Sequence, residues 1–443
     1  MSFKLVVVGQ YDTNIGARTY VMDTPTTYKQ WHVKNREFVF DVDVSKLPCG
    51  VNGALYFVDM DADGGSARFA GNKAGAAYGT GYCDAQCPHD DKFINGEANI
   101  VGWAPDPNGD PNSGDGKFGT CCTEMDIWEA NMLATAVTPH MCTVNGQYRC
   151  NGTECGDDSA GQRFLGVCDK NGCDMNPYRA GDTNFFGPGG GQPQSACNLQ
   201  VGVNNGGVIL GPPTIQIDPT SCCALCNATA SCAGFTYVEA SSNCFLKSSV
   251  GAPTADAGAT SGVKPGPPPP ATASVDTTRP FTVVTQFVTD DGTDTGELTE
   301  IVRFFVQDNV TIPHPSAPSI PPGNFSSITD AFCKAKGQAW GDNDNFEAFG
   351  GLARMGQVLD GGVTLVLSQW LDYEEHMLWL DATSYPPGTP PGPGVARGPC
   401  ATTTGVPADV ISQNPDATVV YSKITVAPIG TTTARLAAGR ARV

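Results

Sequence analysis

Cysteine content constrains the fold of this chain more than any other feature of its sequence. The 443 residues include 18 cysteines, an even number, which indicates a disulfide framework formed in an oxidising compartment. Sequons for N-glycosylation at Asn151, Asn227, Asn309 and Asn324 also favour a secreted, extracellular glycoprotein. The apolar run within residues 1–14 is too short for a signal peptide. We therefore expect the chain to begin inside a longer secreted product.

The net charge limits the partners. At pH 7 it is −19, whereas nucleic acids and anionic membranes are bound through patches of Lys and Arg. The sequence also has no apolar run long enough to span a bilayer. We expect neither nucleic acid nor membrane as a partner, and a neutral polysaccharide is compatible with the charge.

Strand-like patterns dominate the chain. Alternating β-branched and aromatic residues occur at 36–44, 53–61, 281–290, 300–310 and 361–372, separated by Gly, Pro, Asn and Asp. Only the segment 328–336 has a clear helical period. The composition includes 53 Gly and 34 Pro, which also suits a loop-rich β protein. We predict an all-β fold with long loops.

One region differs in composition from the rest. Residues 187–273 are rich in Gly, Pro, Ala and Ser, and they enclose a dense cysteine cluster at 221–249. An ordinary disulfide-pinned loop is one interpretation; an inserted module followed by a polyproline-like linker is the one that we favour. The predicted domains are therefore a larger domain in two parts (1–190 and 275–432), a module (191–250), a linker (251–274) and a tail (433–443).

Three carboxylates lie close together in the segment TCCTEMDIWEAN, residues 120–131. Glu124 and Asp126 are two residues apart, so both project from one face of a strand. Retaining hydrolysis of a glycosidic bond needs a carboxylate nucleophile and a second carboxyl group as acid and base, about 5–5.5 Å apart. Glu129 has the wrong parity for a flat strand. We therefore predict a bulge between Asp126 and Glu129.

Other interpretations of the acidic residues need weighing. Acidic groups on a solvated strand face are common, so this spacing alone is a weak signal. The segment DMDADG at 59–64 resembles the start of a calcium loop, but its twelfth position is Ala70 rather than Glu. The five histidines are dispersed, without metal-ligand spacing. We expect no metal and no cofactor.

The sequence around the carboxylates, CCTEMDIWEANMLATAVTPHMCT (121–143), resembles the catalytic strand of glycoside hydrolase family seven. The resemblance extends through FDVDVSKLPCGVNGALYFVDMDADGG, NGCDMNPYRAGDTNFFGPG and TVVTQFVT. It covers nearly all of 1–190 and 275–430, and the chain begins well inside the family pattern. It implies a concanavalin-like two-sheet β-sandwich (jelly roll) whose long loops roof a substrate groove.

The resemblance also implies a role for each matching residue. Glu124 is similar to the nucleophile, Glu129 to the acid/base, and Asp126 to the carboxyl group that hydrogen-bonds the nucleophile. The implied substrate-binding residues are His140, Arg163, Trp370, Trp379, Arg397, Asn52, Tyr56, Tyr82, Asp84, Gln86 and Lys92. The implied reaction is retaining hydrolysis of β-1,4-glucosidic bonds in cellulose by double displacement, with release of cellobiose.

Disulfide pairing follows from the same resemblance. The family pattern implies bridges 49–400, 83–122, 87–121, 142–168, 150–155 and 173–333, which leaves six cysteines, all within the insert. The cluster around Cys222, Cys223 and Cys226 is similar to a PAN/Apple module, a fold associated with binding carbohydrate or protein. Its pairing stays open, because six cysteines allow 15 connectivities.

The sequence says less about whether the enzyme cuts at chain ends or within the chain than about the reaction itself. A full-length loop between Trp103 and Cys121 and the retained segment 150–168 favour a cellobiohydrolase over an endoglucanase. We expect a monomer whose partners are cellulose or other β-1,4-glucan chains. Ser159 and Glu374 replace usual tunnel tyrosines, and Asn171 replaces a usual aspartate, so we expect a looser tunnel. An endoglucanase of the same family and a non-catalytic carbohydrate-binding protein are the alternatives.

Overall fold

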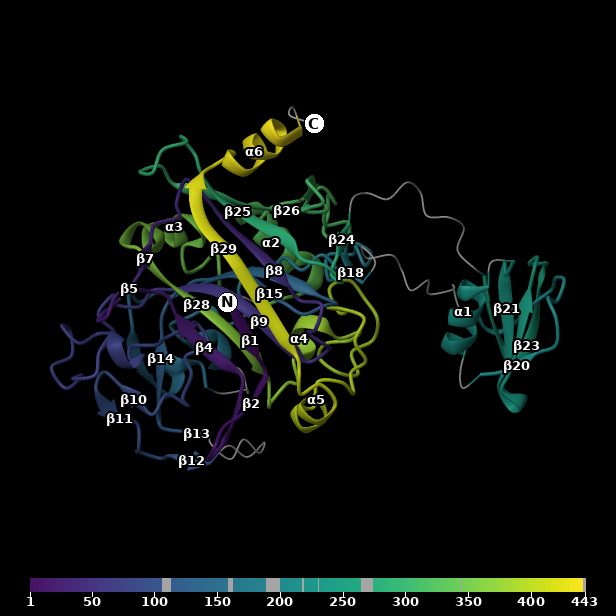
Figure 1. The fold of residues 1–443 in the computed structure, drawn as a ribbon, viewed down its shortest axis with the longest axis horizontal. Helices are drawn as coiled ribbons and strands as arrows, with labels where there is room; N and C mark the ends of the chain where they lie inside the picture. The colour runs from purple at the N-terminus through teal and green to yellow at the C-terminus, as the bar shows by residue number, and fades with distance from the viewer. Residues whose placement is uncertain are drawn as a thin grey trace. The chain divides into compact units, whose positions relative to one another are not determined.

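The computed structural model describes residues 1–105, 113–157, 162–188, 200–216, 219–229, 231–263, 274–343 and 345–440. The chain forms two units, one of residues 1–190 with 273–443 and one of residues 191–272 (Figure 1). Among the residues described, no helix has the length and apolar character to cross a bilayer.

Two antiparallel sheets build the larger unit. The first has the order β1, β29, β8, β25, β26, β27, with bounds Ser2–Lys4, Thr418–Pro428, Arg36–Asp43, Phe281–Thr289, Leu298–Gln307 and Val310–Pro313. The second has the order β16, β15, β9, β28, β4, with β7 also paired to β28; the bounds are Thr135–His140, Glu124–Ala130, Val51–Val58, Val363–Leu371, Ala17–Tyr20 and Gln30–Trp31. The predicted strands at 36–44, 53–61, 281–290, 300–310 and 361–372 are confirmed as β8, β9, β25, β26 and β28.

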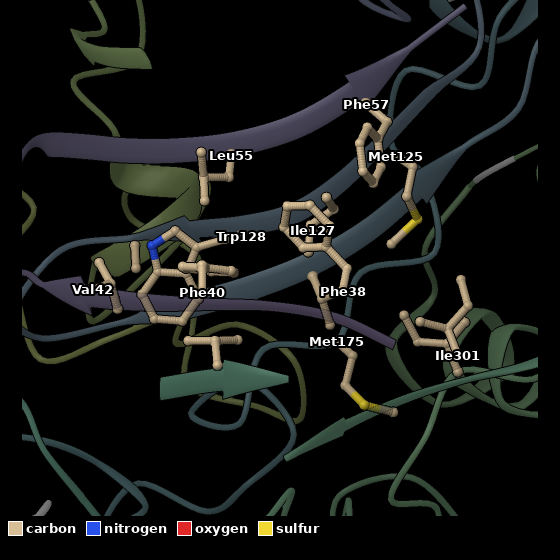
Figure 2. Packing of buried hydrophobic residues seen from close by; sticks show 14 of the residues in the cluster. Phe38, Phe40, Val42, Leu55, Phe57, Met125, Ile127, Trp128, Met175 and Ile301 are labelled. Carbon is tan, nitrogen blue, oxygen red and sulfur yellow. The ribbon is translucent and has the colours of Figure 1, made fainter. Parts of the chain in front are cut away.

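The core lies between these sheets. Alternate side chains of β8, Phe38 and Phe40, meet Phe57 of β9 and Trp128 of β15 with ring centroids 5.2 and 5.9 Å apart (Figure 2). Edge-to-face pairs of this kind add to the stability gained by burying the rings. The second sheet also has a buried outer face, because β9 is buried along its whole length. Long loops, including the one that carries Tyr82, cover that face.

Helices are few among the described residues (Figure 1), and α2 and α3 contribute side chains to the core. The described α-helices of the larger unit are α2 (Asp330–Trp340), α3 (Gly351–Gly361), α4 (Leu378–Asp381), α5 (Pro407–Gln413) and α6 (Thr431–Arg440). The predicted helix at 328–336 is confirmed as α2, whose Thr329 hydroxyl caps it by accepting a hydrogen bond from the Phe332 N–H, 3.1 Å away. Helix α3 was not predicted, because its three glycines mask the helical period.

The six disulfides expected in the larger unit are all present: Cys49–Cys400, Cys83–Cys122, Cys87–Cys121, Cys142–Cys168, Cys150–Cys155 and Cys173–Cys333. Two of them, Cys83–Cys122 and Cys87–Cys121, tie one long loop to the residues just before β15. They therefore hold the loop over the strand that carries the three carboxylates.

The smaller unit is a five-stranded sheet with one helix. The order is β19, β23, β21, β22, β20, with bounds Gln200–Asn205, Pro253–Val263, Gly234–Val238, Asn243–Lys247 and Thr214–Ile215, and the helix is α1 (Pro219–Ala228). Disulfides Cys222–Cys244 and Cys226–Cys232 join α1 to its surroundings, and Cys223 is also disulfide-bonded. Cys197 lies outside the described residues.

The predicted linker needs a correction. Residues 253–263 were assigned to it on their Pro, Gly and Ala content, but they form β23 and pair with both β19 and β21. Small side chains suit this position, and residues 259–262 are buried in the module. Most of the remaining predicted linker, residues 264–273, lies outside the described residues.

Candidate active site

A bulge in β15 brings the three carboxylates to one face of the second sheet. Against β16, Asp126 faces Thr138 and Glu129 faces Ala136, so β15 has one residue more than its partner over this stretch. Against β9 the register shifts between Asp126 and Trp128. The predicted bulge is confirmed. Its extra residue lets Ile127 and Trp128 both enter the core, as Figure 2 shows, and this restores Glu129 to the face of Asp126.

Glu124 and Asp126 form a hydrogen-bonded pair. Their carboxyl groups bond to each other, and Glu124 Oε2 also accepts from the Ala85 N–H at 3.1 Å. Asp126 Oδ2 lies 3.1 Å from His140 Nε2. His140 Nδ1 lies 2.9 Å from the carbonyl oxygen of Asp169, which can only accept, so Nδ1 carries a proton. The His140–Asp126 contact therefore holds a further proton, on one group or the other.

Glu129 is held from a neighbouring strand. Asn52 of β9, which is 0% exposed, donates from Nδ2 to Glu129 Oε1 at 2.9 Å, and its Oδ1 accepts from the Ala130 N–H at 3.1 Å. The resemblance implied a substrate contact for Asn52. In the structure its side chain is completely buried and makes two bonds to β15, one of them to Glu129.

Burial raises the pKa of all three carboxyl groups. Burial and the nearby Asp174 raise the pKa of Glu129 to about 7, against the lowering effects of His140, Asn52 and Arg303. Burial raises the pKa of Asp126 well above its ordinary value, and Glu129 adds to this rise. Burial and Asp126 likewise raise the pKa of Glu124. The site therefore retains protons at neutral pH that exposed carboxyl groups would lose.

A second cluster of polar residues includes Tyr56, Tyr82 and Asp84. Tyr56 and Tyr82 join their hydroxyls at 2.9 Å, and Tyr82 donates to Asp84 Oδ2 at 2.6 Å. Arg18 of β4 lies over the Tyr82 ring, 3.5 Å from its centroid, and pairs with Asp91 at 3.5 Å. The structure thus brings together three residues that the sequence predicted and two that it missed.

The predicted Lys92 lies beside this cluster. It lines a pocket of about 410 Å³ together with Arg18, Asp91 and Phe93. Arg18 and Asp91 escaped the sequence analysis because isolated charged residues outside a motif give no signal.

Two predicted tryptophans lie together. Trp370 of β28 and Trp379 of α4 stack with centroids 6.2 Å apart and an interplanar angle of 29°. Trp370 is 36% exposed, and the Trp379 indole N–H donates to Asp372 Oδ2 at 3.0 Å. Trp370 is therefore exposed enough to stack on a sugar face, and the Trp379 ring beside it is held by Asp372.

Arginines lie at a further polar cluster. Arg163 donates from Nε to Asn171 Oδ1 at 3.0 Å. The Arg397 guanidinium lies 5.2 Å from the Tyr385 ring centroid, and burial with the nearby Arg179 lowers its pKa to about 10. Gln86 donates to the Lys170 carbonyl oxygen at 2.8 Å, which links it to the segment containing Asn171.

The structure also bears on the two positions where tunnel tyrosines are replaced and on the loop that resembles a calcium site. Ser159 lies outside the described residues, and the Glu374 N–H donates to Asp372 Oδ1 at 3.0 Å. In the loop at 59–64, Asp63 accepts from the Gly65 and Ala67 N–H groups, and Asp61 pairs with Arg68 at 2.8 Å. Glu124, Asp126 and His140 place one potential ligand atom each within 4.8 Å of one another, and proton sharing among them accounts for that closeness.

A sheet face that carries two Glu and an Asp supplies the pair of carboxyl groups that glycoside hydrolases use. The family model for glycosyl hydrolase family 7 matches residues 1–201 and 269–433, and a PAN domain model matches residues 204–247. The chain belongs to glycosyl hydrolase family 7, with a PAN domain inserted in its sequence.

Solved structures agree with this assignment. A family 7 cellobiohydrolase from Daphnia pulex is 43% identical, with a TM-score of 0.75, over 97% of this chain and 79% of that one. The Melanocarpus albomyces cellobiohydrolase complexed with cellotetraose is 36% identical, with a TM-score of 0.72, over 97% and 78%. The Humicola insolens endocellulase EGI is 30% identical, with a TM-score of 0.64, over 97% and 77%.

Proposed function

We propose that this enzyme hydrolyses β-1,4-glucosidic bonds of cellulose with retention of anomeric configuration and releases cellobiose. Glu124 attacks the anomeric carbon, while Glu129 protonates the departing oxygen and then activates water. The single observation that carries the proposal is the bulge, which places Glu129 on the same face as Glu124 and Asp126. Similarity to cellobiohydrolases, one of them complexed with cellotetraose, supports cellulose as the substrate.

The two glutamates differ in their surroundings as this mechanism requires. Glu124 accepts a hydrogen bond from the Ala85 N–H and is bonded to the Asp126 carboxyl. The Ala85 donor and the nearby His140 favour the ionised form of Glu124, against the effects of burial and of Asp126. Glu129 has one side-chain donor, Asn52, and burial raises its pKa to about 7, so it carries a proton in mildly acidic solution. Asp126 lies between Glu124 and His140 and is bonded to both side chains.

Release of cellobiose from chain ends is the finer part of the proposal. The segment at 150–168 is anchored by Cys142–Cys168 and Cys150–Cys155, and His89 bonds to Asp157 there at 2.8 Å. A pinned loop beside the site favours a covered groove. The endoglucanase alternative rests on the 30% identical endocellulase. The ratio of soluble to insoluble reducing ends released from cellulose separates the two, since an end-cutter gives almost entirely soluble ends.

Substitution of the two glutamates tests their roles. Glu124→Gln should lower kcat by about 10³-fold or more on every substrate, because it removes the nucleophile. Glu129→Gln should lose about 10²–10⁴-fold on cellotetraose but much less in bond cleavage of 2,4-dinitrophenyl β-cellobioside, whose leaving group needs no acid. Azide should then restore turnover of that substrate and yield β-cellobiosyl azide.

The outcomes separate the possibilities. An α-azide product would contradict a covalent intermediate on Glu124. Equal losses on both substrates in Glu129→Gln would remove Glu129 as the acid. Full activity in Glu124→Gln would show that Glu124 is not the nucleophile, whereas a parent that binds cellotetraose without hydrolysing it would favour the non-catalytic binding protein.

A further inference from the structure

One buried cation in the core of the larger unit takes no direct part in the proposed mechanism. Arg303 lies on β26, in the row of core-facing residues between Ile301 and Phe305, and is only 2% exposed. Its neighbours in that row are apolar, so a guanidinium there is costly in free energy unless it serves a purpose.

Arg303 extends from the first sheet to the second. Its Nη1 donates to the carbonyl oxygen of Ala136 at 3.1 Å, and Ala136 is the residue of β16 that faces Glu129 across the bulge. The guanidinium carbon also lies 5.5 Å from the Trp128 ring centroid. Arg303 therefore contacts both sides of the bulge that aims Glu129.

Among the residues that the structure describes, no carboxylate forms an ion pair with Arg303. Its Nε and Nη2 have no hydrogen-bond partner among the residues that the structure describes. Burial lowers the pKa of Arg303 to about 9, and Glu129 is the charged group that opposes this shift. The guanidinium is therefore cationic in mildly acidic solution, and its field acts on Glu129 at low local dielectric.

We infer that Arg303 is a positioning residue for Glu129: it fixes the bulge through Ala136 and supplies the buried positive charge that makes Glu129 a stronger acid. The inference rests on the proposed role of Glu129. Proton transfer to the leaving group is faster when the pKa of the acid lies near the working pH, so a cation on its core side tunes the step without touching substrate.

Other ionisable groups also face Glu129. His140 from β16 lowers its pKa and Asp174 raises it, and the charges of Glu129 and of Asp126 on the same strand repel each other. Asp174 itself is buried, which alone would raise its pKa, but Arg179 and other cations hold that pKa well below its ordinary value. Asp174 therefore stays ionised through the range in which Glu129 titrates, and its contribution is constant.

Arg303→Lys and Arg303→Gln form the matched pair for the test. Both keep a hydrogen-bond donor on a shorter side chain, and only Lys keeps the charge. The measurement is kcat/KM against pH on cellotetraose and on 2,4-dinitrophenyl β-cellobioside, in the full chain. For the Gln variant we expect the basic limb on cellotetraose to move up by roughly half a pH unit or more, with kcat about 10-fold lower. The Lys variant should keep the parent's basic limb.

A structural role alone gives a different result. If Lys and Gln lose activity equally, on both substrates, and neither moves the basic limb, the inference is wrong. Should Arg303→Gln fail to fold, Arg303→Met replaces it as the neutral variant, because an apolar side chain suits this buried position. If the parent shows a basic limb that Glu129→Gln retains, the role of Glu129 fails instead, which is a separate result.

Discussion

At the scale of single residues, the surroundings of Glu129 decide when the enzyme can act. The side chain is 9% exposed and lies among Asn52, His140 and Arg303. Burial disfavours the charged form, whereas each of these three neighbours favours it. The pKa of about 7 is the net result, and it separates Glu129 from an exposed glutamate, which would be ionised at the same pH.

The pH dependence follows with a definite sign. The mechanism needs Glu129 protonated, so activity is present below its raised pKa and is lost as the pH rises through about 7. We expect kcat/KM on cellotetraose to fall with a basic limb near pH 7. On 2,4-dinitrophenyl β-cellobioside that limb should be weak or absent. A cellotetraose profile that stays flat to pH 9 would show that Glu129 is not the acid.

At the scale of secondary-structure elements, the bulge in β15 depends on its neighbour β9. Asn52 of β9 bonds both to the Ala130 N–H and to Glu129. A strand that departs from regular pairing leaves backbone groups to satisfy, and a buried amide side chain with both a donor and an acceptor satisfies them.

Replacement of Asn52 tests this dependence. Asn52→Ala should lower kcat on cellotetraose by about 10–100-fold with little change in KM, because Glu129 loses its orienting donor, and should destabilise the fold by about 1–3 kcal/mol. Asn131→Ala is the matched control: Asn131 is also 0% exposed and bonds Asp381 Oδ2 at 2.7 Å. Equal loss of kcat in both variants would reduce Asn52 to a general structural role.

The sequence predicted much at this scale, for physical reasons that differ by element. The five long strands follow from their alternation, and the bulge follows from the parity of Glu129 relative to Glu124. Helix α3 and strand β23 were missed because Gly and Ala, four of the 11 residues in α3 and five of the 11 in β23, interrupt their pattern, and small residues carry little periodic signal. Arg303 and Arg18 were missed because their value depends on what lies across the core or groove, which no spacing along the chain records.

At the scale of the whole molecule, the insert leaves and re-enters the larger unit at one place. Strands β18 (Phe186–Gly187) and β24 (Val275–Asp276) pair in parallel, with Phe186 opposite Val275. The two ends of residues 191–272 are therefore attached to neighbouring strands of the larger unit, which keeps its own core. We propose that the insert is a separate folding unit with its own ligand, carbohydrate or protein.

Removal of the insert tests its independence. Replacing residues 191–272 by a short Gly/Ser linker should leave kcat/KM on cellotetraose within about threefold of the parent, because the strand pair at the junction stays closed. Binding of the parent and the variant to insoluble cellulose would then show whether the insert recognises that polymer. Loss of cellotetraose turnover together with loss of cooperative thermal unfolding would show that the insert is integral to the larger unit.

The central claim is that Glu124 and Glu129, brought to one face by the bulge, act by double displacement. The most direct measurement is the anomeric configuration of the first product of cellotetraose hydrolysis, followed by ¹H NMR before mutarotation. Our account predicts that the newly formed reducing end appears first as the β-anomer and equilibrates later. Initial formation of the α-anomer would contradict it.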